Sequence, residues 1–116
     1  MYNPETGDTP LMMAIKTKKN SRPIMKYILK HPREVNIEDK NFKGDTCLMI
    51  ATISGNLNVV KMLIEDYGAD PNTKENKGYT PFMAACCNYD DCLDIMEYFR
   101  KLKNPRVNLH ARCFDG

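Results

Sequence analysis

The chain has 116 residues, of which 42% are hydrophobic and 28% are charged, and its formal net charge is +2. This length suits one domain with its own core, and a charge so close to zero does not by itself indicate nucleic acid or a membrane surface. The cysteine count of five is odd, the first residues form no apolar signal segment, and no apolar run is long enough to span a membrane. We therefore expect free thiols, no membrane insertion, and a reducing compartment, the cytoplasm or the nucleus.

The chain repeats itself three times. Segments 7–14, 44–51 and 78–85 read GDTPLMMA, GDTCLMIA and GYTPFMAA, so their shared threonine recurs after 37 and then 34 residues. A second marker runs in phase with the first, because Asn36, Asn72 and Asn108 are spaced by 36 residues. Internal repeats of this period are typical of a solenoid, in which each copy is one structural unit.

A short helix is predicted at the start of each copy. Thr9, Thr46 and Thr80 are good N-cap residues, because a threonine hydroxyl accepts a hydrogen bond from an otherwise unpaired N–H group. Proline follows two of them at the first helical position, where its missing N–H carries no penalty. Apolar or small residues then recur at i, i+3 and i+4, on one helix face: Leu11, Ala14 and Ile15; Leu48, Ala51 and Thr52; Phe82, Ala85 and Cys86.

A second helix is predicted later in each copy, from an amphipathic run with charged residues between the apolar ones. A stop signal lies four residues before each marker asparagine, at Pro32, Gly68 and Asn104. One such helix pair cannot bury its apolar faces alone, so we expect the copies to stack. The apolar positions are Ile24, Met25, Ile28 and Leu29; Val59, Val60, Leu63 and Ile64; Ile95, Met96 and Phe99.

These segments resemble the ankyrin repeat family, whose signature opens with Gly-x-Thr-Pro-Leu-His-x-Ala and closes with Gly-Ala-Asp-x-Asn. The second copy is the most similar, with GDTCLMIA at 44–51 and GADPN at 68–72. The resemblance covers nearly the whole chain. It implies a single all-α domain, an ankyrin-type helix-loop-helix solenoid with long hairpin-like loops on one side. The motif histidine is methionine in every copy, so we expect apolar packing in place of the polar network that this histidine forms in the family: Met12, Met49 and Met83.

The repeats are expected to span about 5–41, 42–75 and 76–113, with 114–116 beginning a fourth repeat. The third repeat has no polar capping face in its sequence and keeps the apolar pattern of an internal repeat, at Ala85, Ile95, Phe99 and Leu102. We therefore expect the chain to be a section of a longer array, or its last face to be covered by another subunit, which includes self-association.

The resemblance also implies where a partner binds, namely along the loops and the exposed side of the first helices, which line a concave groove. Loop positions beside the motif glycines and groove-facing positions late in the first helices are carried over one residue at a time. They are Phe42, Lys43, Asp45, Ile53, Ser54, Asn76, Lys77, Tyr79, Cys87 and Asn88, with Lys16 and Thr17 at the equivalent place in the first repeat.

Phe42 and Tyr79 are the sharpest candidates, because aromatic residues dominate interface hot spots and a loop tip offers no core to enter. The alternative is that each ring lies on its own neighbouring loop. Phe114 occupies the position of Phe42 in the fourth repeat. A single exposed apolar residue such as Ile53 is a weaker candidate.

Charge is uneven along the chain. From Lys16 to Arg33 there are seven basic residues and no acidic one, while Asp90, Asp91, Asp94 and Glu97 lie in the third repeat. The basic stretch fits either a nucleic-acid partner or a solvated outer helix face, and the second is favoured because no aromatic–basic interleaving accompanies it.

Metal and catalytic sites are not indicated. Two sets of residues could in principle form such sites: the soft ligands Cys86, Cys87, Cys92, His110 and Cys113, and the two histidines, His31 and His110. The soft ligands do not have a familiar zinc spacing, and the family expects a small buried residue at Cys86. There is no phosphate loop, no His-Glu-x-x-His and no Gly-x-Ser-x-Gly, and neither histidine has a visible catalytic partner. We expect no enzyme activity, no cofactor and no small-molecule substrate.

The sequence therefore predicts a protein-protein interaction module. The competing interpretation is a substrate-recruiting segment of a larger enzyme or effector, and nucleic-acid binding by the first repeat ranks third.

Overall fold

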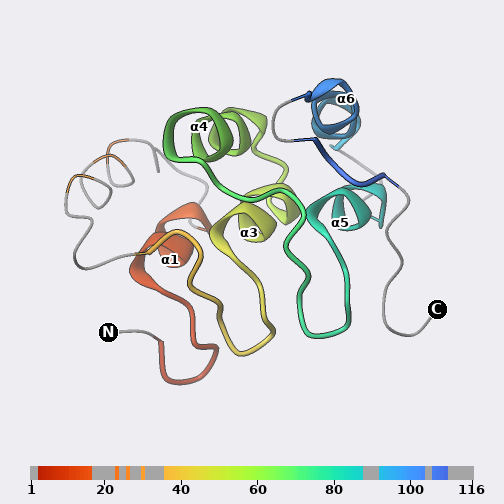
Figure 1. Ribbon diagram of the computed structural model, residues 1–116. Coiled ribbons are helices and arrows are strands. Elements are labelled where there is room, and N and C mark those ends of the chain that lie inside the picture. The colour runs from red at the N-terminus through yellow and green to blue at the C-terminus, as the bar shows by residue number, and fades with distance from the viewer. Residues whose placement is uncertain are drawn as a thin grey trace.

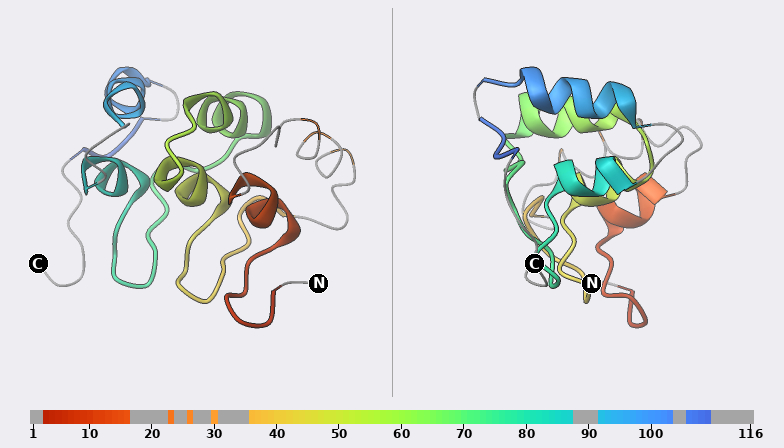
Figure 2. Two further views of the ribbon diagram at one scale, coloured as in Figure 1. Left: turned by 180° about the vertical axis from the view of Figure 1, so that it is seen from behind. Right: turned by 90° about the vertical axis from the view of Figure 1, so that its right-hand side faces the viewer.

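The computed structural model describes residues 3–16, 23, 26, 30, 36–87, 92–103 and 106–109, and these residues contain five helices and no strand. Helices α1 (Pro10–Lys16), α3 (Cys47–Ile53) and α5 (Pro81–Cys87) lie side by side in one row, and α4 (Leu57–Tyr67) and α6 (Leu93–Lys101) form a second row (Figure 1). Long loops extend from the first row on the side away from α4 and α6, as all views show (Figure 2). This arrangement confirms the predicted all-α solenoid.

The three predicted N-caps are present. Each threonine hydroxyl accepts a hydrogen bond from the backbone N–H three residues later, at 3.3 Å for Thr9, 3.5 Å for Thr46 and 3.3 Å for Thr80. These bonds satisfy N–H groups that have no partner within their own helix. The first helix of every copy therefore begins directly after its threonine.

The second helices end close to their predicted stops. Gly68 ends α4 in the left-handed conformation, with φ of 69°. Helix α6 ends at Lys101, slightly before the predicted stop at Asn104, which lies outside the described residues. The second helix predicted for the first repeat, with Ile24, Met25, Ile28, Leu29 and the stop at Pro32, also lies outside them.

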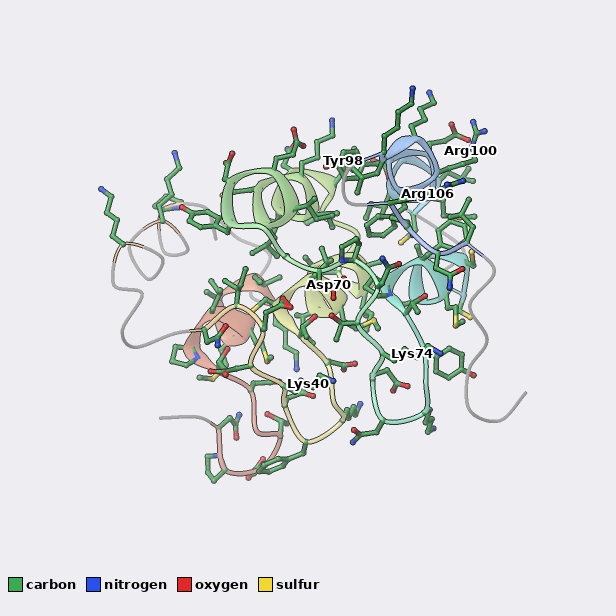
Figure 3. All side chains as sticks on the ribbon, in the orientation of Figure 1. Lys40, Asp70, Lys74, Tyr98, Arg100 and Arg106 are labelled. Carbon is green, nitrogen blue, oxygen red and sulfur yellow. The ribbon has the colours of Figure 1, made fainter. Side chains whose placement is uncertain are left out.

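The two rows are joined by a continuous apolar core. The first-row residues predicted to face inward are buried in α1 and α3, and Val59, Leu63, Ile95 and Phe99 of the second row are at most 1% exposed. Along the outer surface, Tyr98 of α6 donates a hydrogen bond of 2.9 Å to Glu65 of α4 (Figure 3). No helix in the described part of the chain combines the length and apolar character needed to cross a bilayer.

The outer side of α5 differs from the prediction. Cys86 was expected to be a small buried residue, yet it is exposed, whereas its counterpart Thr52 is fully buried. The reason is that α5 covers α3 on this side, while no described element covers α5. Three apolar residues of the third repeat are buried in the core that it shares with the second repeat: Ala85, Ile95 and Phe99.

Leucines of two second helices provide a matched test of this packing. Leu63→Ala is expected to lower the free energy of unfolding by about 2–5 kcal/mol, because it leaves a cavity under α4. Leu93→Ala should change it by less than about 0.5 kcal/mol, because Leu93 is 76% exposed. Urea unfolding followed by far-UV circular dichroism measures both, and equal losses would contradict this assignment of the core.

Candidate partner-binding groove

Three loops project from the first row of helices, and we call them fingers 1, 2 and 3 (residues 3–8, 40–45 and 74–79). Each is closed by backbone hydrogen bonds across its own turn, such as Asn41 N–H to Asp45 O at 3.0 Å and Glu75 N–H to Tyr79 O at 2.9 Å. A glycine with positive φ follows each tip, which allows the tight reversal. The fingers are therefore ordered hairpin-like loops.

Adjacent fingers are also tied to each other. The backbone N–H of Phe42 donates to Thr6 O, and that of Asn76 donates to Lys43 O, both at 2.9 Å. The Asn76 side chain donates to Phe42 O at 2.8 Å. Lys40 Nζ of finger 2 donates to the carbonyl of Lys74 in finger 3 at 3.2 Å; Figure 3 labels both residues. These bonds fix the register between neighbouring repeats.

Phe42 has a structural contact as well as an exposed surface. Gly7 has φ of 75°, and a Cβ atom there would come within 2.5 Å of the Phe42 ring. The ring therefore covers the bare glycine of finger 1. This contact agrees with the alternative interpretation, in which the ring lies on a neighbouring loop. Because 59% of Phe42 stays exposed, the uncovered part of the residue still faces the groove beside it.

A groove of about 810 Å³ is lined by fingers 2 and 3 and by the first helices α3 and α5. Fingers 2 and 3, which are hydrogen-bonded side by side, form its wall, and side chains of α3 and α5 form its floor. The helix residues are spaced so that they share a face, with Met49 and Ile53 on α3 and Ala84 and Cys87 on α5. The wall residues are Phe42, Lys43, Asp45, Glu75, Asn76, Lys77 and Tyr79.

The structure brings eight of the ten predicted site residues together around this one groove. Ser54 is not among them, because it ends α3 and lines a separate hollow near the turn before α4. Asn88 lies outside the described residues, as do Thr17 and Phe114. Tyr79 was expected at an exposed tip but is half-buried on the groove wall.

Three groove residues were not predicted. Met49 and Ala84 belong to the first helices, and Glu75 lies at the base of the turn in finger 3. Met49 is only 2% exposed and lies beneath the groove. Because the sequence pattern indicates a buried position for Met49, it does not predict a place in the groove. Glu75 is aligned with Asn41, one repeat earlier, and this alignment was the available signal.

Finger 1 holds a satisfied buried carboxylate. Asp8 accepts a hydrogen bond from Lys16 Nζ at 2.6 Å and another from Asn41 Nδ2 at 2.9 Å, and its side chain is only 3% exposed. Burial by itself would raise the pKa of Asp8, but the hydrogen bonds from Lys16, Asn41 and Thr6 outweigh it and hold the pKa below its usual value.

Asp45 is the counterpart of Asp8, and its surroundings are less favourable. It is 6% exposed, and the next finger presents Glu75 where Asn41 faces Asp8. Burial raises the pKa of Asp45, and the Glu75 carboxylate raises it further against weaker opposition from Lys43. The Glu75 carboxylate itself accepts hydrogen bonds from the backbone N–H groups of Lys77 at 2.6 Å and Tyr79 at 3.0 Å.

The remaining candidates are less informative. Of the basic stretch, the structure describes Lys16, Lys26 and Lys30, which are all exposed. In the described residues no three His, Cys, Asp or Glu side chains gather as a metal site would require, and His110 and Cys113 lie outside them. Cys86 and Cys87 are exposed free thiols, and burial raises the pKa of Cys47 to about 12.

The two aspartates predict opposite responses to substitution. Asp8→Asn should lower stability at pH 7, because an ionised group with a lowered pKa stabilises the fold; this loss should fade as the pH falls through that pKa. Asp45→Asn should raise stability at pH 7, because ionisation above about pH 3.9, the unfolded value, destabilises the fold.

Urea midpoints at pH 7 and near pH 2 would measure both effects, which are expected to shrink at the lower pH. Glu75→Gln is the companion variant, because it removes the like charge while keeping an acceptor for the two N–H bonds. Equal signs for the two Asn variants at pH 7 would refute this account of the carboxylates.

Comparison with known proteins gives the family. The family model described as ankyrin repeats (3 copies) matches residues 11–110. Alpha-latrocrustotoxin-Lt1a of Latrodectus tredecimguttatus is 33% identical over 90 residues, which are 78% of this chain and 6% of that protein. Mouse protein phosphatase 1 regulatory subunit 27 is 37% identical over 74 residues, which are 64% of this chain and 46% of that protein. The chain thus spans less than half the length of either relative.

The fold is also similar to that of a solved structure. A chain in the crystal structure of the yeast ribosomal protein Rps3 in complex with its chaperone Yar1 is similar, with a TM-score of 0.74 and 27% identity over 86% of this chain and 69% of that chain. Proteins built from these repeats are generally interaction modules rather than enzymes. Three repeats in register, the matching family model and the shared architecture together place this chain in the ankyrin repeat family.

Proposed function

We propose that this chain is a protein-binding module that holds its partner in the groove lined by fingers 2 and 3 and by helices α3 and α5. The observation that carries the proposal is the convergence of exposed apolar side chains on one hollow of about 810 Å³. Phe42 and Ile53 are 59% and 49% exposed, and both line this groove. Exposed apolar side chains grouped in a hollow mark interaction sites, whereas scattered ones do not.

Two of the similar proteins are consistent with this role. One structure pairs a ribosomal protein with its chaperone, and one relative is named as a regulatory subunit of a phosphatase. Because the chain spans only part of its relatives, the groove also fits a second role as the substrate-recruiting segment of a larger enzyme or effector. The exposed free thiols of Cys86 and Cys87 support placing it in a reducing compartment, the cytoplasm or the nucleus.

The test compares two exposed apolar residues on different surfaces. Peptides selected on the full chain from a displayed random library would be measured against Ile53→Asp, which places a charge in the groove floor, and Leu93→Asp, which places one outside it. We expect Ile53→Asp to weaken binding at least about tenfold and Leu93→Asp to leave it unchanged, since a buried unpaired charge disrupts an interface. Fluorescence anisotropy gives both affinities.

Urea unfolding of both variants is the control, because each residue is exposed and neither change should unfold the chain. The proposal is wrong if selected peptides lose affinity for Leu93→Asp and keep it for Ile53→Asp. Phe42→Ala is a poorer probe, because it also uncovers Gly7 and so mixes binding with stability.

A further inference from the structure

The rim of the groove carries two cations in register. Lys43 and Lys77 each precede the glycine of their finger, so they occupy equivalent positions at the tips of fingers 2 and 3. Both side chains are exposed and line the groove, and neither forms an ion pair within the described residues. Equivalent positions on adjacent fingers place the two positive charges side by side along the edge of one groove.

The carboxylates of the groove do not neutralise this rim. Asp45 is buried, and although Lys43 is near enough to lower its pKa, the two do not form an ion pair. The Glu75 carboxylate accepts backbone hydrogen bonds from its own finger at 2.6 and 3.0 Å. Positive charge is therefore presented at the rim, and negative charge is held deeper in the wall.

The floor of the groove is apolar. Met49, Ile53 and Ala84 lie below the opening, and the aromatic residues Phe42 and Tyr79 line its sides. Tyr79 takes the place that a buried aspartate, Asp8 or Asp45, takes in the other two fingers. Finger 3 therefore gives the groove an aromatic side chain at a position where the other fingers have a carboxylate.

We propose that the groove takes a protein segment in which one bulky apolar side chain is flanked by acidic residues. The apolar side chain enters the floor over Ile53, and the flanking carboxylates meet Lys43 and Lys77 at the rim. Charge complementarity of this kind sets the choice of partner and the association rate. The inference rests on the proposed function, because it specifies the chemistry of the segment that the same groove binds.

A nucleic-acid backbone fits this groove less well. A phosphate chain needs several cations along its path and gains nothing from an apolar floor. Here two lysines line the groove, and the carboxylates of Asp45 and Glu75 line it as well. An anchored acidic segment uses both the rim and the floor, so the protein partner is the one the groove favours.

The experiment uses the full chain and four synthetic peptides as probes. One carries a phenylalanine flanked by glutamates, the second the same phenylalanine flanked by lysines, and the third flanked by serines; the fourth replaces the phenylalanine of the first by alanine. We expect the first to bind roughly tenfold or more tighter than the others at low salt, with an advantage that falls as salt rises. Amide chemical shifts should move at Ile53, Lys43 and Lys77.

Charge reversal supplies the decisive comparison. Lys43→Glu with Lys77→Glu should turn the preference toward the lysine-flanked peptide. Lys26→Glu with Lys30→Glu changes the net charge equally at exposed positions of the basic stretch and should leave the preference unchanged. Circular dichroism and urea midpoints establish that both double variants are folded.

The outcomes separate the two proposals. If all three phenylalanine peptides shift groove resonances equally, or if none of the four binds at millimolar concentration, the acidic-segment inference is overturned. The proposed function is judged separately by the library-selected peptides and Ile53→Asp. Equal effects of the two double variants would show that overall charge acts in place of the rim and would also overturn the inference. Tighter binding of generic RNA than of the first peptide would point to a nucleic-acid partner instead.

Discussion

Helix α3 is buried on almost every side, because α1, α4 and α5 all pack against it. Six of its seven residues are buried, and the seventh, Ile53, is exposed in the groove, whose floor also includes the buried Met49. A helix this short has little stability of its own, so its position is fixed by its neighbours. The contacts that bury α3 therefore also fix the position of Ile53 in the groove floor.

The joints between fingers are similar in backbone geometry and different in charge. Both use a backbone hydrogen bond of 2.9 Å from one finger to the next. Between fingers 1 and 2, however, an amide meets a carboxylate at Asn41 and Asp8, while between fingers 2 and 3 two carboxylates, Asp45 and Glu75, share the wall. The groove thus lies at the joint that brings two carboxylates together in place of an amide and a carboxylate. Functional sites often depart from the packing and charge-pairing rules that the rest of a fold follows.

Much of the fold followed from the sequence because its signals are local. A threonine N-cap, a proline after it and a small apolar stripe act within one helix, and all three helices begin where these residues predict. Eight of the site residues followed from their place in the repeat. What the sequence could not show was which side of each helix had a neighbour. Cys86 and Thr52 have the same position in the repeat, yet only Thr52 is covered, because exposure depends on the next repeat and not on the residue.

The contact between Phe42 and Gly7 has a consequence for how such a chain can change. Residue 42 belongs to the turn of one repeat, closes over the backbone of the repeat before it and lines the groove toward the repeat after it. A substitution there alters three units at once, and a side chain at residue 7 would displace the ring. Lys77 and Ile53 also line the groove, and both are exposed. New specificities are thus most accessible through the rim and the floor, while the aromatic fingertip is held in place by the repeat next to it.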